Sequence, residues 1–373
     1  MMYIFEYIWL DGINNCRSKT KVYDLQFYHN KQSLSLKDIP EWNYDGSSTW
    51  QATTENSEVI LKPVRIYKDP FRGTNNAYLV LCENYNIDGT PHEGNMRHHA
   101  TDIFNKALEE EPMFGLEQEF FICRKMKKRL QSNYKPQLMR NKPLDLNILP
   151  NTYIDLIQDN IKVPKGKHYC GVGGEVILER HLMDVALDKL LYCGISVTGL
   201  NAEVAPSQWE FQVCAVGIKA SDDLIMLRYI CNRVFELEGM FMELHPKIDF
   251  IKNQNENGSG CHINFSTKKM REKGGFSHIE KAIDNLSKHH ELHIKHYGEY
   301  NELRLTGKHE TSDIKTFSVG VGSRNTSIRI PSDTKKNNMG YFEDRRPSSN
   351  LDPYVSTSLL FATSIGLEQT YFV

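Results

Sequence analysis

The stretch from Phe114 to Ile122 reads FGLEQEFFI. Side chains on a β-strand alternate between its two faces, so Glu117 and Glu119 project together from one face while apolar residues pack on the other. The two carboxylates then lie about 7 Å apart, and at an effective dielectric of about 20 they repel each other by roughly 2.4 kcal/mol. The pattern predicts a strand with a positive group between two acidic side chains. An ordinary solvated strand face is the alternative.

The same alternation recurs in three further segments, QWEFQV at 208–213, CHINFS at 261–266 and YFEDRRP at 341–347. Their polar residues, with one acid just upstream, are Glu203, Glu210 and Gln212, then His262, Asn264 and Ser266, then Glu343 and Arg345. Carboxylates and one imidazole without a thiolate suit hard divalent cations, Mg²⁺ or Mn²⁺, which often accompany phosphate chemistry. The recurrence favours a metal site over a solvated face, and it favours a ligand role for His262 over that of a hydrogen-bonded core histidine.

Arginines supply a positive complement to these acids. Arg324 and Arg329 lie in the extended stretch 323–331, and Arg345 follows Glu343. Guanidinium groups bind carboxylate and phosphate in a bidentate manner, so the cluster predicts a clamp for an anionic substrate and a transferring phosphoryl group. Surface solubility is the alternative for any one of them. The sequence has no GxxxxGK[ST] loop, and none of its GxG pieces has the third glycine of a Rossmann turn.

The run His289-His290-Glu291-Leu292-His293 is one residue short of the HExxH zinc motif. His289 and His293 could share one face of a helix, since residues four apart are neighbours there. An exposed basic helix explains the run equally well. The motif therefore carries little weight as a metal site.

Composition excludes several classes of protein. The chain has 373 residues, and 45 Lys and Arg against 47 Asp and Glu give a net charge of −2, so a general binder of nucleic-acid backbones is not expected. The opening MMYIFEYIWL lacks a basic leader and a cleavage site, and no stretch reaches the length of a membrane span, so we expect neither a signal peptide nor a bilayer anchor. The eight cysteines form no CxxC pair, which favours reduced thiols and a cytoplasmic location.

Hydrophobic periodicity divides the chain into a mostly β part, residues 1–90, and a mixed part, residues 96–373. Strands are predicted at 3–10, 59–64, 77–83, 114–123, 209–213, 260–266 and 327–331, and helices at 96–110, 182–193, 222–242 and 278–296. Strands and helices do not alternate regularly enough for a doubly wound sheet. The pattern therefore predicts an α+β fold.

Long motifs in a fixed order resemble those of the eukaryotic-type (type II) glutamine synthetases. They are DGSST at 45–49, FGLEQEF at 114–120, NAEV at 201–204, QWEFQ at 208–212, GSGCH at 258–262, NFS at 264–266, LTGKHETS at 305–312, SIRIP at 327–331 and YFEDRRP at 341–347. The likeness runs from about Glu6 to about Tyr354, which is nearly the whole chain.

This resemblance implies a β-grasp domain at 1–90, followed by a catalytic domain with a curved antiparallel sheet and flanking helices. It implies ATP-dependent ligation of ammonia to the γ-carboxylate of L-glutamate through γ-glutamyl phosphate, with two or three Mg²⁺ or Mn²⁺ ions at each active site. It also implies a ring homo-oligomer, of pentameric rings or a decamer, with active sites between subunits. The stretch 125–167 is longer and more basic than in the family and is interpreted as a divergent insertion.

The resemblance also assigns residues to the site. Glu117, Glu203 and Glu210 would hold one metal ion, and Glu119, His262 and Glu343 the other. The implied ATP contacts are Glu117, Glu210, Asn264, Phe265, Ser266, Arg271, Arg324, Arg329, Tyr341 and Phe342. The implied glutamate contacts are Asn255, Glu256, Asn257, Gly258, His262, Arg304, Arg324 and Arg345. The implied catalytic residues are Arg324 at the phosphoryl group, Glu310 on a closing loop, and Glu58, which would serve the ammonium site of a neighbouring subunit.

Two residues depart from the family pattern. Glu58 stands where an aspartate is usual, which predicts weaker use of ammonium, and Met113 stands where an aromatic residue stacks on adenine in many members. Two rival functions are less well supported. The larger Glu58 argues against a ligase for bulkier amines, because it narrows the amine entrance, and the six retained metal positions argue against a catalytically silent homologue.

Overall fold

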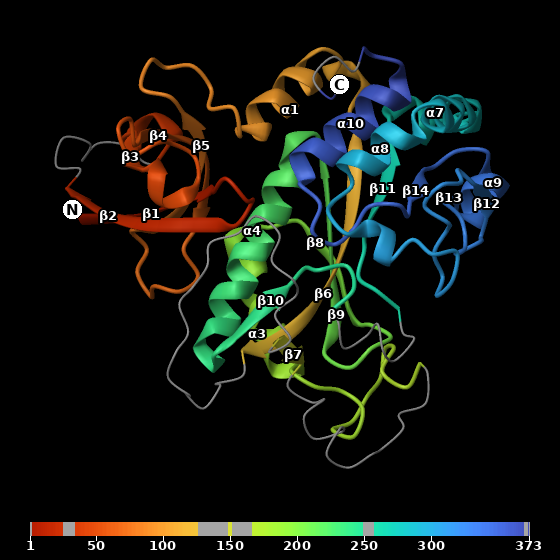
Figure 1. Cartoon of the computed structure of the whole chain (residues 1–373), viewed down its shortest axis with the longest axis horizontal. Coiled ribbons are helices and arrows are strands. Elements are labelled where there is room, and N and C mark those ends of the chain that lie inside the picture. The colour runs from red at the N-terminus through yellow and green to blue at the C-terminus, as the bar shows by residue number, and fades with distance from the viewer. Residues whose placement is uncertain are drawn as a thin grey trace.

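The computed structural model describes residues 2–24, 34–125, 148–150, 166–248, 257–368 and 372. Two β-sheets and a set of helices make up this part of the chain (Figure 1). A five-stranded sheet lies at the N-terminus, and a larger sheet of nine strands follows. This is the mixed α+β architecture that the sequence predicts.

The N-terminal sheet consists of β1 (Met2–Leu10), β2 (Cys16–Asp24), β3 (Trp42–Asp45), β4 (Glu58–Lys68) and β5 (Ala77–Tyr85). The strand order is β2-β1-β5-β4-β3, and only β1 and β5 run parallel. Phe5, Tyr7 and Trp9 alternate along β1 and fill a small core of their own. Ile8, on the opposite face, packs into the large core of the molecule. Both faces of β1 are therefore buried, and the strand predicted at 3–10 is confirmed.

The large sheet has the order β12-β13-β14-β11-β6-β9-β8, with β10 and β7 paired to the far end of β6. Its strands are β6 (Met113–Lys125), β7 (Ile148–Pro150), β8 (Val197–Ala202), β9 (Gln208–Val216), β10 (Met240–Glu243), β11 (Cys261–Ser266), β12 (Val319–Val321), β13 (Ile328–Ile330) and β14 (Phe342–Asp344). Every pairing is antiparallel except that of β12 with β13. The central strand β6 thus has β11 on one side and β9 on the other.

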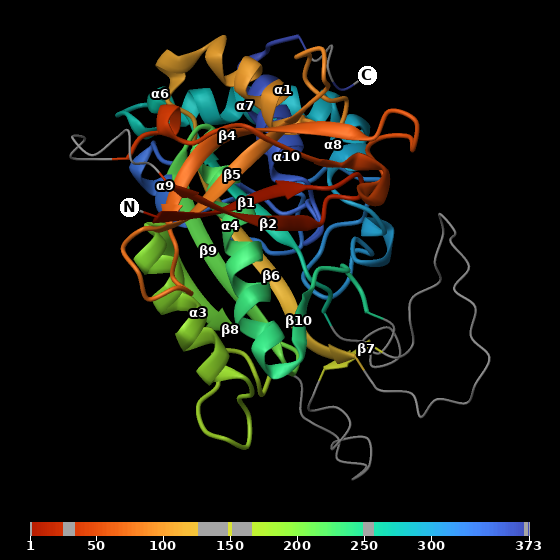
Figure 2. The same ribbon diagram turned by 90° about the vertical axis from the view of Figure 1, so that its left-hand side faces the viewer.

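The helices are α1 (Met96–Asn105), α3 (Arg180–Cys193), α4 (Ile218–Phe235), α6 (Lys268–Arg271), α7 (Phe276–Lys288), α8 (His290–His296), α9 (Ser332–Asn337) and α10 (Pro353–Ile365). Helix α4 lies between the N-terminal sheet and the strands β6 and β9, as the two views show (Figures 1 and 2). It is buried along most of its length, and it shares the main core with α1, α3, α7 and α10. No helix in the described ranges is both long and apolar enough to cross a bilayer.

A buried carboxylate on α4 joins the two parts of the molecule. Asp222 accepts hydrogen bonds from Arg65 Nε of β4 (2.7 Å), from Arg97 Nε of α1 (2.8 Å) and from the Tyr354 hydroxyl of α10 (2.9 Å). Burial would raise the pKa of Asp222, but the hydrogen bonds and charges of Arg97 and Arg65 outweigh it and lower that pKa. An ionised group therefore ties four elements together.

Two predicted helices end earlier than expected, and a third is interrupted. The first ends at Asn105 and is followed by a short 3₁₀ turn at 108–110. The helix predicted at 222–242 ends at Phe235, and Gly239, with φ of 70°, turns the chain into β10. The helix predicted at 278–296 breaks at His289 into α7 and α8. The division into domains at 1–90 and 96–373 stays a prediction, and most of the 125–167 insertion lies outside the described residues.

Candidate active site

Strand β6 places Glu117 and Glu119 at the middle of the large sheet. Glu117 pairs with His262 on β11 and with Gln212 on β9, whereas Glu119 pairs with Glu210 on β9. Because these positions share one face of the sheet, the side chains of three strands gather at one place. The polar face that the sequence predicts is therefore present.

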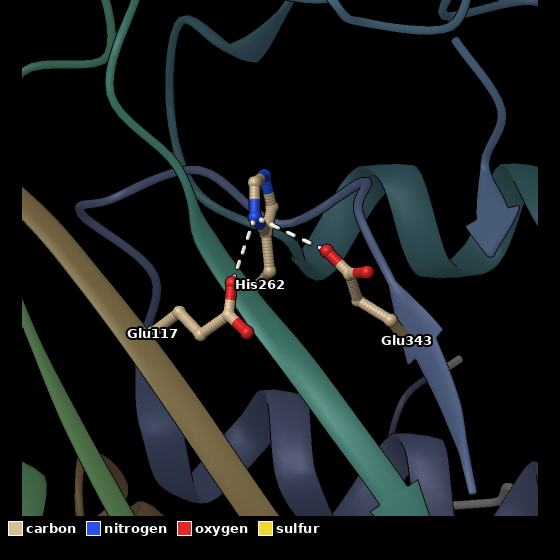
Figure 3. Close-up of side chains that lie close together, drawn as sticks. All are labelled: Glu117, His262 and Glu343. Atoms are coloured by element: carbon tan, nitrogen blue, oxygen red, sulfur yellow. Dashed lines mark hydrogen bonds and ion pairs between the residues drawn. The ribbon is translucent and has the colours of Figure 1, made fainter. Parts of the chain in front are cut away.

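One set of three side chains, which we call the mixed group, consists of Glu117, His262 and Glu343. A potential ligand atom from each lies within 4.8 Å of the other two. His262 Nδ1 lies 3.3 Å from Glu117 Oε2 and 3.5 Å from Glu343 Oε1 (Figure 3). Burial above all, with the charge of Arg345, lowers the pKa of His262 well below its usual value. The imidazole is therefore neutral at pH 7, as a metal ligand must be.

The acids of the mixed group already have partners within the protein. Glu343 is only 1% exposed, and it accepts hydrogen bonds from Arg329 Nη1 at 2.8 Å and from Arg345 Nη1. Asn264 Nδ2 donates to Glu117 Oε1 at 2.8 Å. Two arginines and one amide therefore balance and orient this group.

The second set, which we call the carboxylate group, consists of Glu119, Glu203 and Glu210. Burial, followed by mutual repulsion among neighbouring carboxylates, raises the pKa of Glu119 to about 8, of Glu203 to about 7 and of Glu210 to about 8. Their hydrogen-bond donors are uncharged: Gly260 N at 2.7 Å, Asn201 Nδ2 at 2.8 Å and Gln212 Nε2 at 2.7 Å. Within the ranges that the structure describes, no lysine or arginine forms an ion pair with these three acids. An all-oxygen set with excess negative charge fits a hard divalent cation.

The structure groups these side chains differently from the family resemblance. The resemblance joined Glu117 to Glu203 and Glu210, whereas the structure joins Glu117 to His262 and Glu343. Strand register is the reason. At the level of Glu117, β9 offers an amide and β11 offers the imidazole, while at the level of Glu119, β9 offers a carboxylate.

Both groups line a single cavity of about 490 Å³. Other predicted site residues that line it are Asn257, Gly258, Arg304, Glu310, Arg324, Arg329 and Arg345. Glu58 does not; it lies exposed on β4, where it accepts a hydrogen bond from Asn43 Nδ2. Asn255 and Glu256 lie outside the described residues.

Strand alternation places the side chains of the predicted nucleotide-binding residues on different faces of the sheet. Asn264 reaches Glu117, but Phe265 and Phe342 are fully buried in the main core with their rings 5.5 Å apart. These two can meet a ligand only through backbone atoms, so their side chains do not form a pocket wall. The remaining predicted contacts lie beyond the lining of the cavity: the Ser266 hydroxyl accepts from Arg271 Nη1 at 3.1 Å, and Tyr341 is 42% exposed.

A tight loop from 305 to 314 carries Glu310 to the cavity. Its stem is closed by hydrogen bonds from Ile314 N to Leu305 O (3.1 Å) and from Gly307 N to Ser312 O (3.2 Å). His309 and Glu310 have φ of 55° and 63°, a left-handed conformation that costs energy for residues other than glycine. Glu310 Oε2 lies 3.5 Å from Arg324 Nη1. The loop therefore places an acid against the predicted phosphoryl-binding arginine.

Sequence reasoning missed Tyr169. It lines the cavity, and its proximity helps to raise the pKa of Arg324. The nearby Gly171-Val172-Gly173 is one of the GxG pieces that lack the third glycine of a Rossmann turn. The signal in the sequence was an aromatic residue just before a pair of glycines. The structure then places Tyr169 in the same cavity lining as Asn201 and Glu203.

Comparison with known proteins identifies the family. A model of the "Glutamine synthetase, catalytic domain" matches residues 96–294. Glutamine synthetase of Agaricus bisporus is 44% identical and aligns with 96% of this chain and 92% of its own length; that of Saccharomyces cerevisiae is 43% identical, with 97% and 89%. The chloroplastic glutamine synthetase of Daucus carota is 45% identical, with 98% of this chain and 78% of its own length.

A solved structure agrees at the level of the fold. The cryo-EM structure of Plasmodium falciparum glutamine synthetase superposes with a TM-score of 0.72 at 16% identity, over 98% of this chain and 72% of that one. The order of motifs, the cavity and these likenesses agree. The chain belongs to the glutamine synthetase family of enzymes.

Proposed function

We propose that the protein joins ammonia to the γ-carboxylate of L-glutamate to give L-glutamine, while ATP becomes ADP and phosphate, through γ-glutamyl phosphate. The observation that carries the proposal is the single cavity that both candidate metal groups and four arginines line. Phosphoryl transfer depends chiefly on positioning and on neutralising charge, and these residue types supply both.

The mixed and carboxylate groups would hold divalent cations. Five carboxylates and one neutral imidazole fit Mg²⁺ or Mn²⁺, and the raised pKa values of Glu119, Glu203 and Glu210 mark a place where positive charge is lacking. When bound, such ions would offset the negative charge of the ATP phosphates.

Arginines would bind the two anionic substrates. Arg324 and Arg329 in the cavity lining would bind phosphoryl groups. Arg304, which lies beside Gly258, and Arg345 would bind glutamate. Burial lowers the pKa of Arg304 to about 10, so this side chain remains charged at pH 7. Its Nη2 donates to the carbonyls of Arg345 and Pro347 at 2.9 and 2.7 Å, but its buried Nε has no partner among the described residues. A substrate carboxylate would satisfy that donor.

Glu310 and Glu58 would serve the later steps. The loop that carries Glu310 would close over the acyl phosphate and keep water out, since an acyl phosphate hydrolyses readily. Glu58 is exposed and lies outside the cavity of its own chain. That position supports a role in the ammonium site of a neighbouring subunit within a ring homo-oligomer. All eight cysteines are unpaired, which supports a reducing, cytoplasmic location.

A balanced assay tests the proposal. Purified protein is incubated with ATP, glutamate, ammonium and Mg²⁺, and phosphate and glutamine are measured together. We expect equal amounts of the two products, dependence on all four reagents, and inhibition by methionine sulfoximine. Phosphate release that is independent of glutamate, or a preference for a bulky amine over ammonium, would contradict the proposed reaction.

A further inference from the structure

The histidine motif at 289–293 has an unexpected arrangement. His289 is exposed at the break between α7 and α8, and its Nδ1 bonds the carbonyl of Asn285. His290 and His293 are buried instead. His293 contacts the hydroxyls of Tyr297 (2.6 Å) and Thr363 (2.9 Å). His289 and His293, which could have shared one helix face, do not do so. His290 is the member of the run that contacts two distant segments, through Arg346 and Ile314.

Both ring nitrogens of His290 are engaged. Nδ1 lies 3.1 Å from Arg346 Nη1, and Nε2 lies 2.9 Å from the carbonyl oxygen of Ile314. Arginine can only donate and a carbonyl can only accept, so Nδ1 accepts and Nε2 carries the proton. Burial above all, with the charge of Arg346, lowers the pKa of His290, which agrees with this neutral form. The side chain is therefore a bridge with a fixed direction.

One end of the bridge leads to β14. Arg346 is fully buried, and its Nε and Nη2 grip the two oxygens of Asp344 at 2.9 and 2.7 Å. Asp344 stands between Glu343 and Arg345, and strand alternation turns it to the opposite face. The Tyr297 hydroxyl donates to Asp344 Oδ2 at 2.8 Å. These bonds fix Asp344 on the face away from the cavity. Its neighbours Glu343 and Arg345 line the cavity.

The other end leads to the loop that carries Glu310. Ile314 belongs to the closed stem of this loop, where its own N–H bonds Leu305 O. The bond from His290 Nε2 holds the carbonyl of the same residue. The imidazole of His290 thus connects the segment that follows β14 with the stem of the Glu310 loop, in addition to the bond from Arg345 Nη2 to the carbonyl of Glu310.

We propose that His290 is a positioning residue for the reaction, one that fixes the stem of the Glu310 loop relative to the strand that bears Glu343 and Arg345. This inference rests on the proposed function. A side chain that only filled space would not need an acceptor on one edge and a donor on the other. Loss of both would leave a buried guanidinium N–H and a carbonyl unpaired.

Two substitutions separate the two bonds. The amide oxygen of asparagine reaches the place of Nδ1. His290→Asn therefore keeps an acceptor for Arg346 and loses the hydrogen bond to the carbonyl of Ile314 in the loop. The amide nitrogen of glutamine reaches the place of Nε2. His290→Gln therefore keeps a donor for the carbonyl of Ile314 and loses the hydrogen bond from Arg346. The control is His289→Gln, an exposed neighbour on the same segment.

The readouts are phosphate formed per glutamine, KM for glutamate and the melting temperature. We expect His290→Asn to raise the ratio of phosphate to glutamine about threefold, because the loop no longer excludes water, with KM unchanged. We expect His290→Gln to keep the ratio and raise KM about tenfold, because Arg345 is displaced. The control should match the parent in all three readouts.

The outcomes are distinguishable. If the parent and His289→Gln make no glutamine, the proposed function fails. If they make it and the two His290 variants either match the parent or lose activity without this split, only the present inference is overturned.

Hydrogen exchange of the unmodified enzyme decides the case if both variants fail to fold. The loop at 305–314 and the segment 342–348, which includes β14, should then open with the same dependence on denaturant. A stem that opens independently of the strand overturns the inference.

Discussion

The mixed group and the carboxylate group lie on one sheet and line one cavity, yet their electrostatics differ. In the mixed group Arg329 and Arg345 hold Glu343, and the imidazole is neutral. In the carboxylate group three acids share neutral donors, and their pKa values rise to about 7 or 8. The first group is balanced by arginines of the protein itself, whereas the second has no such ion pair among the described residues and would gain more from an added cation. Similar ligand sets can therefore differ in how much they need the metal.

The largest effects on this contrast are expected when one acid in each group is replaced by its neutral amide. Glu343→Gln leaves two guanidinium groups without their buried partner, so we expect the metal-free protein to lose about 3 kcal/mol of unfolding free energy. Glu210→Gln removes repulsion from the directly opposed Glu119 and should stabilise the metal-free protein by up to about 1 kcal/mol. Both should lower kcat by about a thousandfold.

Denaturant unfolding in a chelator measures the first pair of effects, and the coupled assay measures kcat. Glu291→Gln, an exposed carboxylate on α8, is the control and should change neither quantity. Stability changes of the same sign in both groups would show that the contrast does not exist.

The second test varies pH. The folded carboxylate group has pKa values of about 7 to 8, above the usual 4.5, so the folded state binds more protons than the unfolded state between those limits. The stability that this group contributes is therefore lost as pH rises through that range, and cations must displace the same protons. We expect Mg²⁺ affinity to rise up to about tenfold for each proton displaced per pH unit.

Calorimetric titration with Mg²⁺ at about pH 6 and about pH 8 measures this dependence, and proton release can be read from buffers of different ionisation enthalpy. In Glu210→Gln the dependence on pH should shrink. An affinity that is constant across this range would contradict the raised pKa values.

The third test makes the mixed group resemble the other. Arg329→Gln removes one of the two cations that hold Glu343. The metal-free protein should lose about 1.5 kcal/mol, while its stabilisation by Mg²⁺ should increase, because the added ion now replaces a missing charge. Melting curves with and without Mg²⁺ give both numbers. If stabilisation by the metal were unchanged, charge balance would not set the need for it.

The smallest effect is expected outside both groups. Glu58→Asp shortens an exposed side chain on β4 by one methylene and should lower KM for ammonium a few-fold, about 0.5 kcal/mol, with no change in the metal response. Initial rates over a range of ammonium concentrations measure it. A changed Mg²⁺ response with unchanged ammonium saturation would place Glu58 elsewhere in the reaction.

Alternation along single strands could be predicted from the sequence, because it depends only on local backbone geometry. It correctly placed Glu117 and Glu119 on one face of their strand, and His262 on the polar face of a second strand. The partition into two groups could not be obtained this way, because it depends on which residue of β9 and β11 stands beside each acid. Register is set by the packing of whole sheets, not by any one segment.

The ends of helices were predicted less well for a related reason. Apolar spacing continues through Met240 and Met242, so the sequence indicated one long helix there. In the structure Gly239 ends the helical segment, and the next residues pair with β6 as β10. Likewise, the buried member of the histidine run is His290, because α8 begins at this residue and turns its ring toward Arg346. The ends and the buried faces of these helices are therefore set by tertiary contacts with residues far away in the sequence.

Asp222 has a consequence for the folding of the molecule as a whole. Its carboxylate holds Arg65 from the first sheet and Arg97 from α1, while its own helix supports the second sheet. Separation of the two halves would break the bond between Arg65 and Asp222 and leave Arg97 as the arginine partner of this carboxylate, which is unfavourable. The halves should therefore melt in one cooperative transition, and neither should persist as an autonomous folding unit after the other has unravelled.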